Sequence, residues 1–124
     1  MTKKLFLEQN TQAGEIYAGI VLGQNGKGDH HLFLIPATTQ PLNWNDAIKW
    51  AESVGGGLPT RSEQAILYGN LKSEFEPRWH WSSEQDADND GYAWMQYFDH
   101  GSQFYTHKSG ESRARAVRRL SIIE

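Results

Sequence analysis

Two apolar segments near the N-terminus are separated by a turn signal. Residues 15–22 and 30–35 are rich in Ile, Leu, Val and aromatic side chains, which favour β-strands. Between them stands Asn25-Gly26, a pair of residues that tolerate the positive φ angles of a tight hairpin turn. The pattern predicts a β-hairpin that ends at Pro36, preceded by a loose N-terminal arm over residues 1–14.

The next apolar positions follow the spacing of a helix. One buried face is predicted from Trp44, Ala47, Ile48, Ala51 and Val54. Asn43 is placed to cap the N-terminus of this helix, and three glycines at 55–57 are expected to end it. A second helix is predicted to start at once, because Thr60-Arg61-Ser62-Glu63 matches a capping box.

The second half of the chain is rich in aromatic residues. Nine of the chain's fifteen Phe, Trp and Tyr residues lie between Phe75 and Tyr105, and the pattern of this region predicts strands at 79–81, 92–98, 103–107 and 113–120. Residues 82–91 are expected to form a polar loop. Strands that flank two adjacent helices indicate an α+β domain with an antiparallel sheet, and 124 residues suffice for one such domain.

Composition narrows the function classes. The net charge is −3, which argues against a general nucleic-acid-binding protein, and no apolar segment is long enough to span a membrane. The chain has no cysteine, so disulfides, thiolate metal sites and cysteine nucleophiles are excluded. Because residues 1–15 lack the apolar core of a signal peptide, we expect synthesis in the cytoplasm.

Charge is distributed unevenly along the chain. Six acids and one base lie between Glu74 and Asp90, whereas residues 108–119 hold five bases and one acid. Either the two segments neutralise each other in the fold, or the arginines line a site for an anionic partner. Asp86-x-Asp88-x-Asp90-Gly91 resembles the first half of a calcium-binding loop, but position 97 holds Tyr where an EF-hand needs Glu. An acidic solvated loop and a looser calcium site stay as alternatives, and we expect no resident cofactor.

Motifs for catalysis are weak. His30 and His31 are neighbours on a predicted strand, so their side chains point to opposite faces, and the remaining histidines come from separate elements. Ser82-Ser83 does not stand in the Gly-x-Ser-x-Gly pattern of a hydrolase elbow. We therefore expect a protein that is not an enzyme.

A set of short motifs, in fixed order, resembles a known family. The motifs are Trp44-x-x-Ala47, Gly57-Leu58-Pro59-Thr60 followed by Glu63, Trp81-Ser82-Ser83, Tyr92-Ala93-Trp94 with Phe98 and Gly101, and Arg115-Ala116-Val117-Arg118. Over residues 42–120 the chain resembles the Lcl C-terminal-like family, domains of unknown function that are frequent in prophages and bacterial surface proteins. The resemblance implies a C-type-lectin-like fold of the formylglycine-generating-enzyme branch, with two helices on a twisted antiparallel sheet. Formylglycine-generating chemistry itself needs cysteines, which this chain lacks.

Most of these marks are interpreted as structural. Trp44 is expected to join the first helix to the sheet, while Pro59 and Thr60 set the start of the second helix. Arg115 and Arg118 are three residues apart on the predicted last strand and therefore face opposite sides. One of them is expected to form a buried ion pair, with Glu63 as the candidate partner.

The sequence thus predicts a non-enzymatic binding domain of phage or prophage origin that recognises a protein or a glycan, in the first instance as a receptor-binding virion component. An intracellular phage accessory protein that inhibits a host protein is the alternative, followed by a calcium-dependent sugar-binding module. No nucleic acid or membrane is expected as a partner, and the resemblance allows a homo-oligomer. The residues predicted to contact the partner are Asp86, Asp88, Asp90, Trp81, Trp94, Tyr105 and Arg113.

Overall fold

The computed structural model describes residues 1–123, which form a mixed α+β structure, as the sequence predicts. In chain order the elements are α1 (Lys3–Asn10), β1 (Ile16–Val21), β2 (His30–Leu34), α2 (Trp44–Ser53), α3 (Arg61–Leu71), the short 3₁₀ helix η1 (Lys72–Glu74), β3 (Trp79–Gln85), β4 (Tyr92–Tyr97), β5 (Gln103–His107) and β6 (Val117–Ser121). None of the helices in residues 1–123 is long and apolar enough to cross a membrane.

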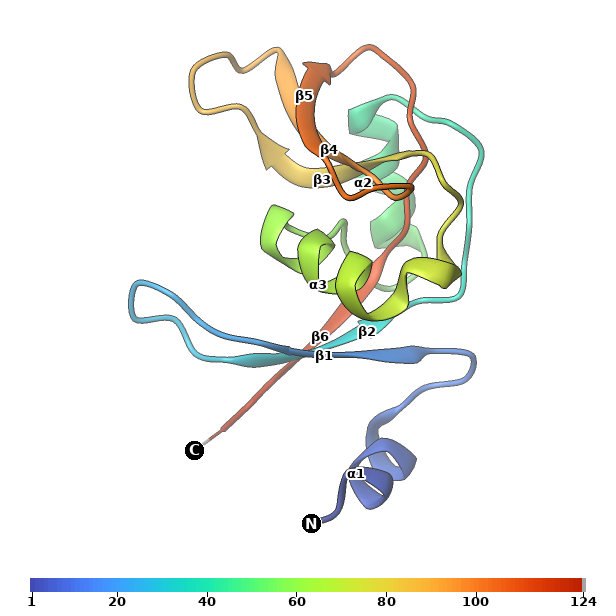
Figure 1. Ribbon diagram of the computed structural model, residues 1–124, viewed down its shortest axis with the longest axis vertical. Coiled ribbons are helices and arrows are strands. Elements are labelled where there is room, and N and C mark those ends of the chain that lie inside the picture. Colours follow the sequence, from blue (N-terminus) through green and yellow to red (C-terminus); the bar gives the residue numbers. More distant parts are fainter. Residues whose placement is uncertain (124) are drawn as a thin grey trace.

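The strands form two separate antiparallel sheets, so the prediction of one sheet is wrong. One sheet has the strand order β1-β2-β6 and the other has the order β3-β4-β5. Figure 1 shows the first sheet below α3 and the second above it, and α3 contacts strands of both. The split arises because the last strand returns across the molecule to pair with β2, which lies far earlier in the sequence.

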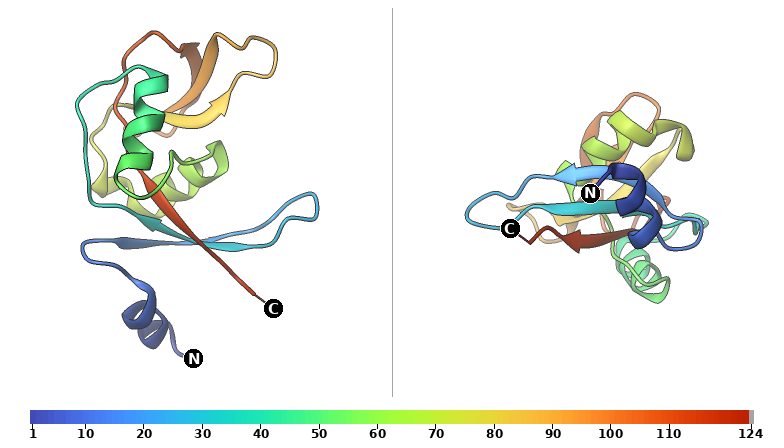
Figure 2. Two further views of the ribbon diagram at one scale, coloured as in Figure 1. Left: turned by 180° about the vertical axis from the view of Figure 1, so that it is seen from behind. Right: turned by 90° about the horizontal axis from the view of Figure 1, so that it is seen from below.

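The N-terminal hairpin forms as predicted, with Asn25 (φ 56°) and Gly26 (φ 82°) both in the left-handed region at its turn. The segment before it contains a helix, α1, where the sequence predicted a loose arm. Thr2 caps this helix, and the ring of Phe6 packs on His31 at a centroid distance of 4.2 Å. Helix α1 therefore lies on the face of the first sheet that points away from α3 (Figure 2).

Both predicted helix starts are confirmed. The Asn43 side chain accepts a hydrogen bond from the backbone N–H of Asp46 at the start of α2. At the start of α3, the Thr60 hydroxyl accepts from the N–H of Glu63, and the Glu63 carboxylate accepts from the N–H of Thr60. These local contacts satisfy backbone donors that a helix leaves unpaired, so they set where α3 begins.

Two predicted boundaries in the second half are wrong. Strand β3 continues to Gln85, so the loop covers residues 86–91 and not 82–91. Ser82 is buried, and its polar groups are satisfied within the protein. Its carbonyl accepts a hydrogen bond from the Trp44 indole (2.8 Å), and its hydroxyl donates to the carbonyl of Trp94 (2.7 Å). The indole contact is the link between the first predicted helix and the sheet that was expected of Trp44. The last strand starts at Val117, not at residue 113.

The buried ion pairs differ from the predicted ones. Glu63 pairs with Arg119 (2.6 Å) and with His30 (2.7 Å), and neither Arg115 nor Arg118 contacts it. Arg118 pairs instead with Glu15, and its guanidinium lies over the ring of Phe33. The sequence-based prediction considered only Arg115 and Arg118 as partners of Glu63, and so missed Arg119. Alternation from Val117 turns Arg119, not Arg118, toward α3.

Arg115 lies outside β6, where it is buried and donates to the backbone carbonyls of Glu74 and Ile35. Arg115 therefore links η1 and β2, because it satisfies one carbonyl group in η1 and one directly after β2. Burial is the main effect on its guanidinium and lowers its pKa from the usual value. Arg115 is structural, as the sequence predicts, but through backbone contacts and without an ion pair to Glu63.

Candidate binding face on strands β4 and β5

Aromatic and amide side chains form a row of cross-strand pairs on one face of the β4–β5 hairpin. The register pairs Tyr92 with His107, Trp94 with Tyr105 and Gln96 with Gln103. Because side chains alternate along a strand, all six share one face of the sheet. We call this face, together with Arg61 above it, the β4–β5 face.

The aromatic pairs of this face are in direct contact. The rings of Trp94 and Tyr105 meet edge to face at 5.2 Å, and Tyr92 contacts Tyr105 in the same manner at 5.7 Å. The hydroxyl of Tyr92 lies 3.1 Å from Nε2 of His107. Edge-to-face packing fixes ring orientation, so these side chains form a preorganised surface.

The outer strand, β5, exposes two large rings. Phe104 is 57% exposed and Tyr105 is 38% exposed, whereas large aromatic side chains are usually buried. Their rings stack nearly parallel, with an interplanar angle of 3°. Exposed neighbouring aromatic rings are typical of recognition surfaces, where they supply contact area at little entropic cost.

Arg61, the first residue of α3, lies flat over this aromatic row. Its guanidinium carbon is 3.5 Å from the centre of the Trp94 ring, within the range of a cation–π contact. Its Nε donates to the side-chain oxygen of Gln103 (3.1 Å), and the Gln103 amide donates back to the carbonyl of Arg61 (2.8 Å). The capping box that sets the start of α3 therefore also sets the position of this guanidinium.

A chain of amides anchors Arg61 to the protein interior. Gln103 donates to the side-chain oxygen of Gln96 (2.7 Å), and Gln96 donates to the carbonyl of Gln64 (3.0 Å). Gln96 and Gln64 are both buried, and Gln64 donates in turn to the carbonyl of His80. Because each amide is fixed by the next, the Arg61 side chain is held in one position.

No acid within residues 1–123 forms an ion pair with the guanidinium of Arg61. The ion pairs formed within residues 1–123 involve Arg113, Arg118, Arg119 and His30, but not Arg61. Glu84, the nearby acid, accepts from the backbone N–H of Arg61 and so caps the helix. The two terminal nitrogens of the guanidinium make no hydrogen bond within the described residues. Such a planar fork suits a carboxylate or a phosphate.

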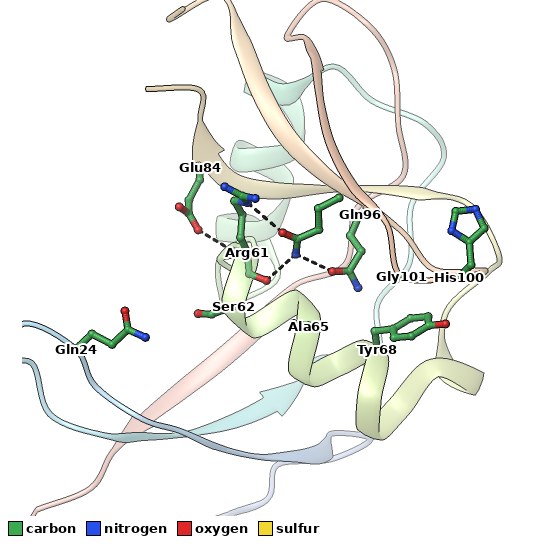
Figure 3. A pocket seen from close by; sticks show the side chains of 10 residues that line it. Gln24, Arg61, Ser62, Ala65, Tyr68, Glu84, Gln96, His100 and Gly101 are labelled. Carbon is green, nitrogen blue, oxygen red and sulfur yellow. Dashed lines mark hydrogen bonds between the residues drawn. The ribbon is translucent and has the colours of Figure 1, made fainter. Parts of the chain in front are cut away.

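An open groove of about 670 Å³ adjoins this guanidinium. Figure 3 shows Arg61 and Glu84 at one end of the groove, Tyr68 and His100 at the other, and Gln96 between them. Gln24 reaches the groove from the N-terminal hairpin, which belongs to the other sheet. The groove thus extends the β4–β5 face toward α3 and the hairpin.

The structure brings together some of the predicted contact residues. Trp94 and Tyr105 are cross-strand neighbours at the centre of the face. Trp81 is fully buried, with its indole N–H bonded to the carbonyl of Leu42, so the prediction that it contacts a partner is wrong. Arg113 lies beside β3, two strands away from β5, and pairs with Glu76 (2.8 Å), so it does not belong to this face.

The predicted acidic loop joins β3 to β4. The loop contains Asp86, Asp88 and Asp90, and the last two are exposed. Within residues 1–123, no three His, Asp or Glu side chains gather closely enough to hold a metal ion. The three carboxylates are therefore not arranged as a calcium site and form a charged rim next to Tyr92.

The most strongly shifted titratable group, His80, lies in the interior. The pKa of His80 is lowered to about 4, mainly by burial and to a lesser extent by the charges of Arg115 and Arg113, while the hydrogen bond to the carbonyl of Arg78 acts in the opposite direction. Its ring packs edge to face on Phe75 and Phe98. His80 is thus a neutral core residue and does not lie on the β4–β5 face.

Sequence reasoning missed Arg61, Gln103, His107 and Phe104. The alternation of Tyr92, Trp94 and Gln96 pointed to one face of a strand, but the residues opposite depend on register. Arg61 was visible only as the second residue of a capping box. The chain matches no protein-family model and no curated protein sequence.

Proposed function

We propose that the chain is a non-enzymatic, C-type-lectin-like binding domain whose β4–β5 face recognises a protein or a glycan. The observation that carries the proposal is the stack of Arg61 on Trp94 beside the exposed ring of Tyr105. Trp, Tyr and Arg are the residue types that dominate binding energy at protein interfaces. Aromatic faces beside amide groups equally suit sugar rings.

A binding role without catalysis fits the use of the titratable groups. Glu63, Glu15 and His80, whose pKa values are lowered, hold structural contacts in the interior or between strands. The polar groups of the β4–β5 face are mostly engaged with one another, as in the bonds of Gln103. Catalytic sites instead bring shifted titratable groups together in one cleft.

The phage or prophage origin of this binding domain rests on the motif resemblance over residues 42–120. Within that setting, Asp86, Asp88 and Asp90 form the rim of the recognition surface and Trp94 and Tyr105 form its centre. The buried marks of the motif set, Trp44 and Glu63 among them, serve as scaffold.

The test compares partner capture by the wild-type chain and by two variants. The immobilised chain is exposed to bacterial lysate and, separately, to a glycan array. The double variant Arg61→Gln/Tyr105→Ala alters the β4–β5 face. The control variant Arg113→Gln removes an arginine beside β3.

We expect a ligand that the wild type and Arg113→Gln bind equally and that the double variant loses by about tenfold or more. Melting curves of all three chains show whether the variants are folded. The proposed function is contradicted if the double variant binds the ligand as well as the wild type does. It is also contradicted if none of the three chains captures a ligand. Turnover of a ligand by the wild type contradicts the non-enzymatic part.

A further inference from the structure

The outer edge of β5 offers backbone groups to a second strand. Within the described residues, β5 has a single neighbouring strand, β4. The N–H of Tyr97 donates to the carbonyl of Ser102, and the N–H of Lys108 donates to the carbonyl of Gly91, which sets the phase of the hydrogen-bonded pairs. By antiparallel alternation, Phe104 and Thr106 bond to β4, whereas Gln103 and Tyr105 direct their N–H and C=O groups outward.

This edge lacks the features that usually protect an edge strand. Such strands are blunted by lysine, proline or a bulge, and β5 has the sequence QFYTH with a regular register against β4. Its central residues are the two exposed rings, Phe104 and Tyr105. An unprotected edge with exposed apolar side chains is typical of a site where a strand of another chain adds to the sheet.

Arg61 adds a charge requirement on one side of the edge. It shares the face of Gln103 and Tyr105, and no carboxylate within residues 1–123 pairs with its guanidinium. A strand added beside β5 would alternate its side chains between this face and the opposite one. A partner side chain on the Arg61 face meets a fixed cationic fork, and its neighbours along the partner strand lie next to the stacked rings of Phe104 and Tyr105.

We infer that the β5 edge binds an extended segment of a partner protein that carries a carboxylate on the Arg61 face and apolar side chains next to it, which pack on the rings of Phe104 and Tyr105. This inference rests on the proposed function and names the partner class. The carboxylate comes either from an Asp or Glu side chain or from the C-terminus of the partner. The aromatic pair of Phe104 and Tyr105 favours a peptide over an acidic sugar, because it asks for apolar cover as well as charge.

The probe is a library of random peptides displayed with either blocked or free C-termini, panned against the full chain. We expect enriched peptides in which one acidic residue has an aliphatic or aromatic residue immediately before and after it. Enrichment only in the free-terminus library assigns the carboxylate to the chain end, and enrichment in both assigns it to a side chain. Replacing the acid of an enriched peptide by its amide should weaken binding by about tenfold to a hundredfold.

Variants of the chain separate the charge from the edge. Arg61→Gln should lose the preference for the acidic peptide over its amide form, and Arg113→Gln should retain it. Tyr105→Ala removes the ring but keeps the N–H, whereas Tyr105→Pro removes both. Because this N–H points away from β4, proline at 105 leaves the pairing of β4 and β5 intact. The two chains should melt alike, and Tyr105→Pro should bind more weakly than Tyr105→Ala.

No enrichment of acidic peptides, equal binding of the acid and amide forms, or equal binding by Tyr105→Ala and Tyr105→Pro overturns the inference. The inference is also overturned if a glycan binds at this face and no peptide does. That last result leaves the proposed function standing, since a glycan lost by Arg61→Gln/Tyr105→Ala still makes the β4–β5 face a recognition surface. Loss of the face dependence itself overturns both.

Discussion

The two sheets of this protein use their arginines in different ways. On the β1-β2-β6 sheet, Arg118 and Arg119 pair with Glu15 and Glu63, whose side chains are only 3% and 1% exposed. Next to the β3-β4-β5 sheet, Arg61 lies on an aromatic ring and pairs with no acid of the described chain. The first arrangement holds elements together, and the second keeps a charge available at the surface.

The two arrangements should differ in what they contribute to stability and to the proposed recognition. A buried carboxylate that loses its cation is strongly destabilising, because the remaining charge is kept away from water. A partly exposed arginine on a tryptophan contributes little to folding, since water solvates it in either state. Substitutions on the two sides should therefore give opposite patterns of stability loss and binding loss.

The largest stability effect is expected for Glu63→Ala. The change leaves Arg119 and His30 without their acid and removes half of the capping box of α3. We expect a loss of about 3 to 4 kcal/mol in the free energy of unfolding, measured by urea denaturation. The surface variant Glu52→Ala on α2 is the control and should change stability by less than about 0.5 kcal/mol. Equal losses for the two variants would contradict the scaffold role of Glu63.

A second large effect is expected in the pH dependence. Burial holds the pKa of His80 at about 4 in the folded chain, below the usual value of 6.5. The unfolded chain therefore takes up a proton first as the pH falls, and stability is lost between about pH 6.5 and 4, by about 2 to 3 kcal/mol in total. His80→Asn keeps a donor for the carbonyl of Arg78 and should flatten this part of the curve. An unchanged slope between pH 7 and 5 would show that His80 is not the group responsible.

A smaller loss is expected for Arg118→Met. Its hydrogen bonds are the main cause of the lowered pKa of Glu15, so the variant should raise that pKa and destabilise the chain by about 1 to 2 kcal/mol at neutral pH. The double variant Glu15→Gln/Arg118→Met removes the unpaired charge and should recover much of the loss. Failure of the double variant to recover stability would assign the effect to packing on Phe33 and not to charge.

The smallest stability effect is expected for Arg61→Gln. Only a cation–π contact and one side-chain hydrogen bond are lost, both partly exposed, so unfolding should change by about 1 kcal/mol or less. The same variant should show the largest loss of partner affinity. A stability loss as large as that of Glu63→Ala would make Arg61 a scaffold residue and remove the contrast between the two sheets.

Features encoded within a few residues were predictable from the sequence. The turn at Asn25-Gly26 and the caps at Asn43 and Thr60 depend on neighbouring residues alone, and all three form as expected. Residue type and strand alternation named Trp94 and Tyr105 as contact candidates, but the same reasoning named Trp81, which is fully buried, because a local pattern does not say which face of a strand is covered.

Features that depend on distant pairing were not predictable in the same way. The separation into two sheets depends on where β6 pairs, and the partner of Glu63 depends on which residue of β6 lies beside the start of α3. Helix α1 is stabilised by a contact between Phe6 and the outer face of β2, which no local pattern announces. Arg61 acquires its role only once α3 is placed over β4.

The most direct test of the role proposed for the β4–β5 face is hydrogen exchange of the chain with and without its captured ligand. The account predicts slower exchange at the backbone amides of Gln103 and Tyr105 and at the start of α3, with the β1-β2-β6 sheet unchanged. Protection confined to the N-terminal hairpin or to the segment around Arg113, with β5 exchanging as before, would contradict it.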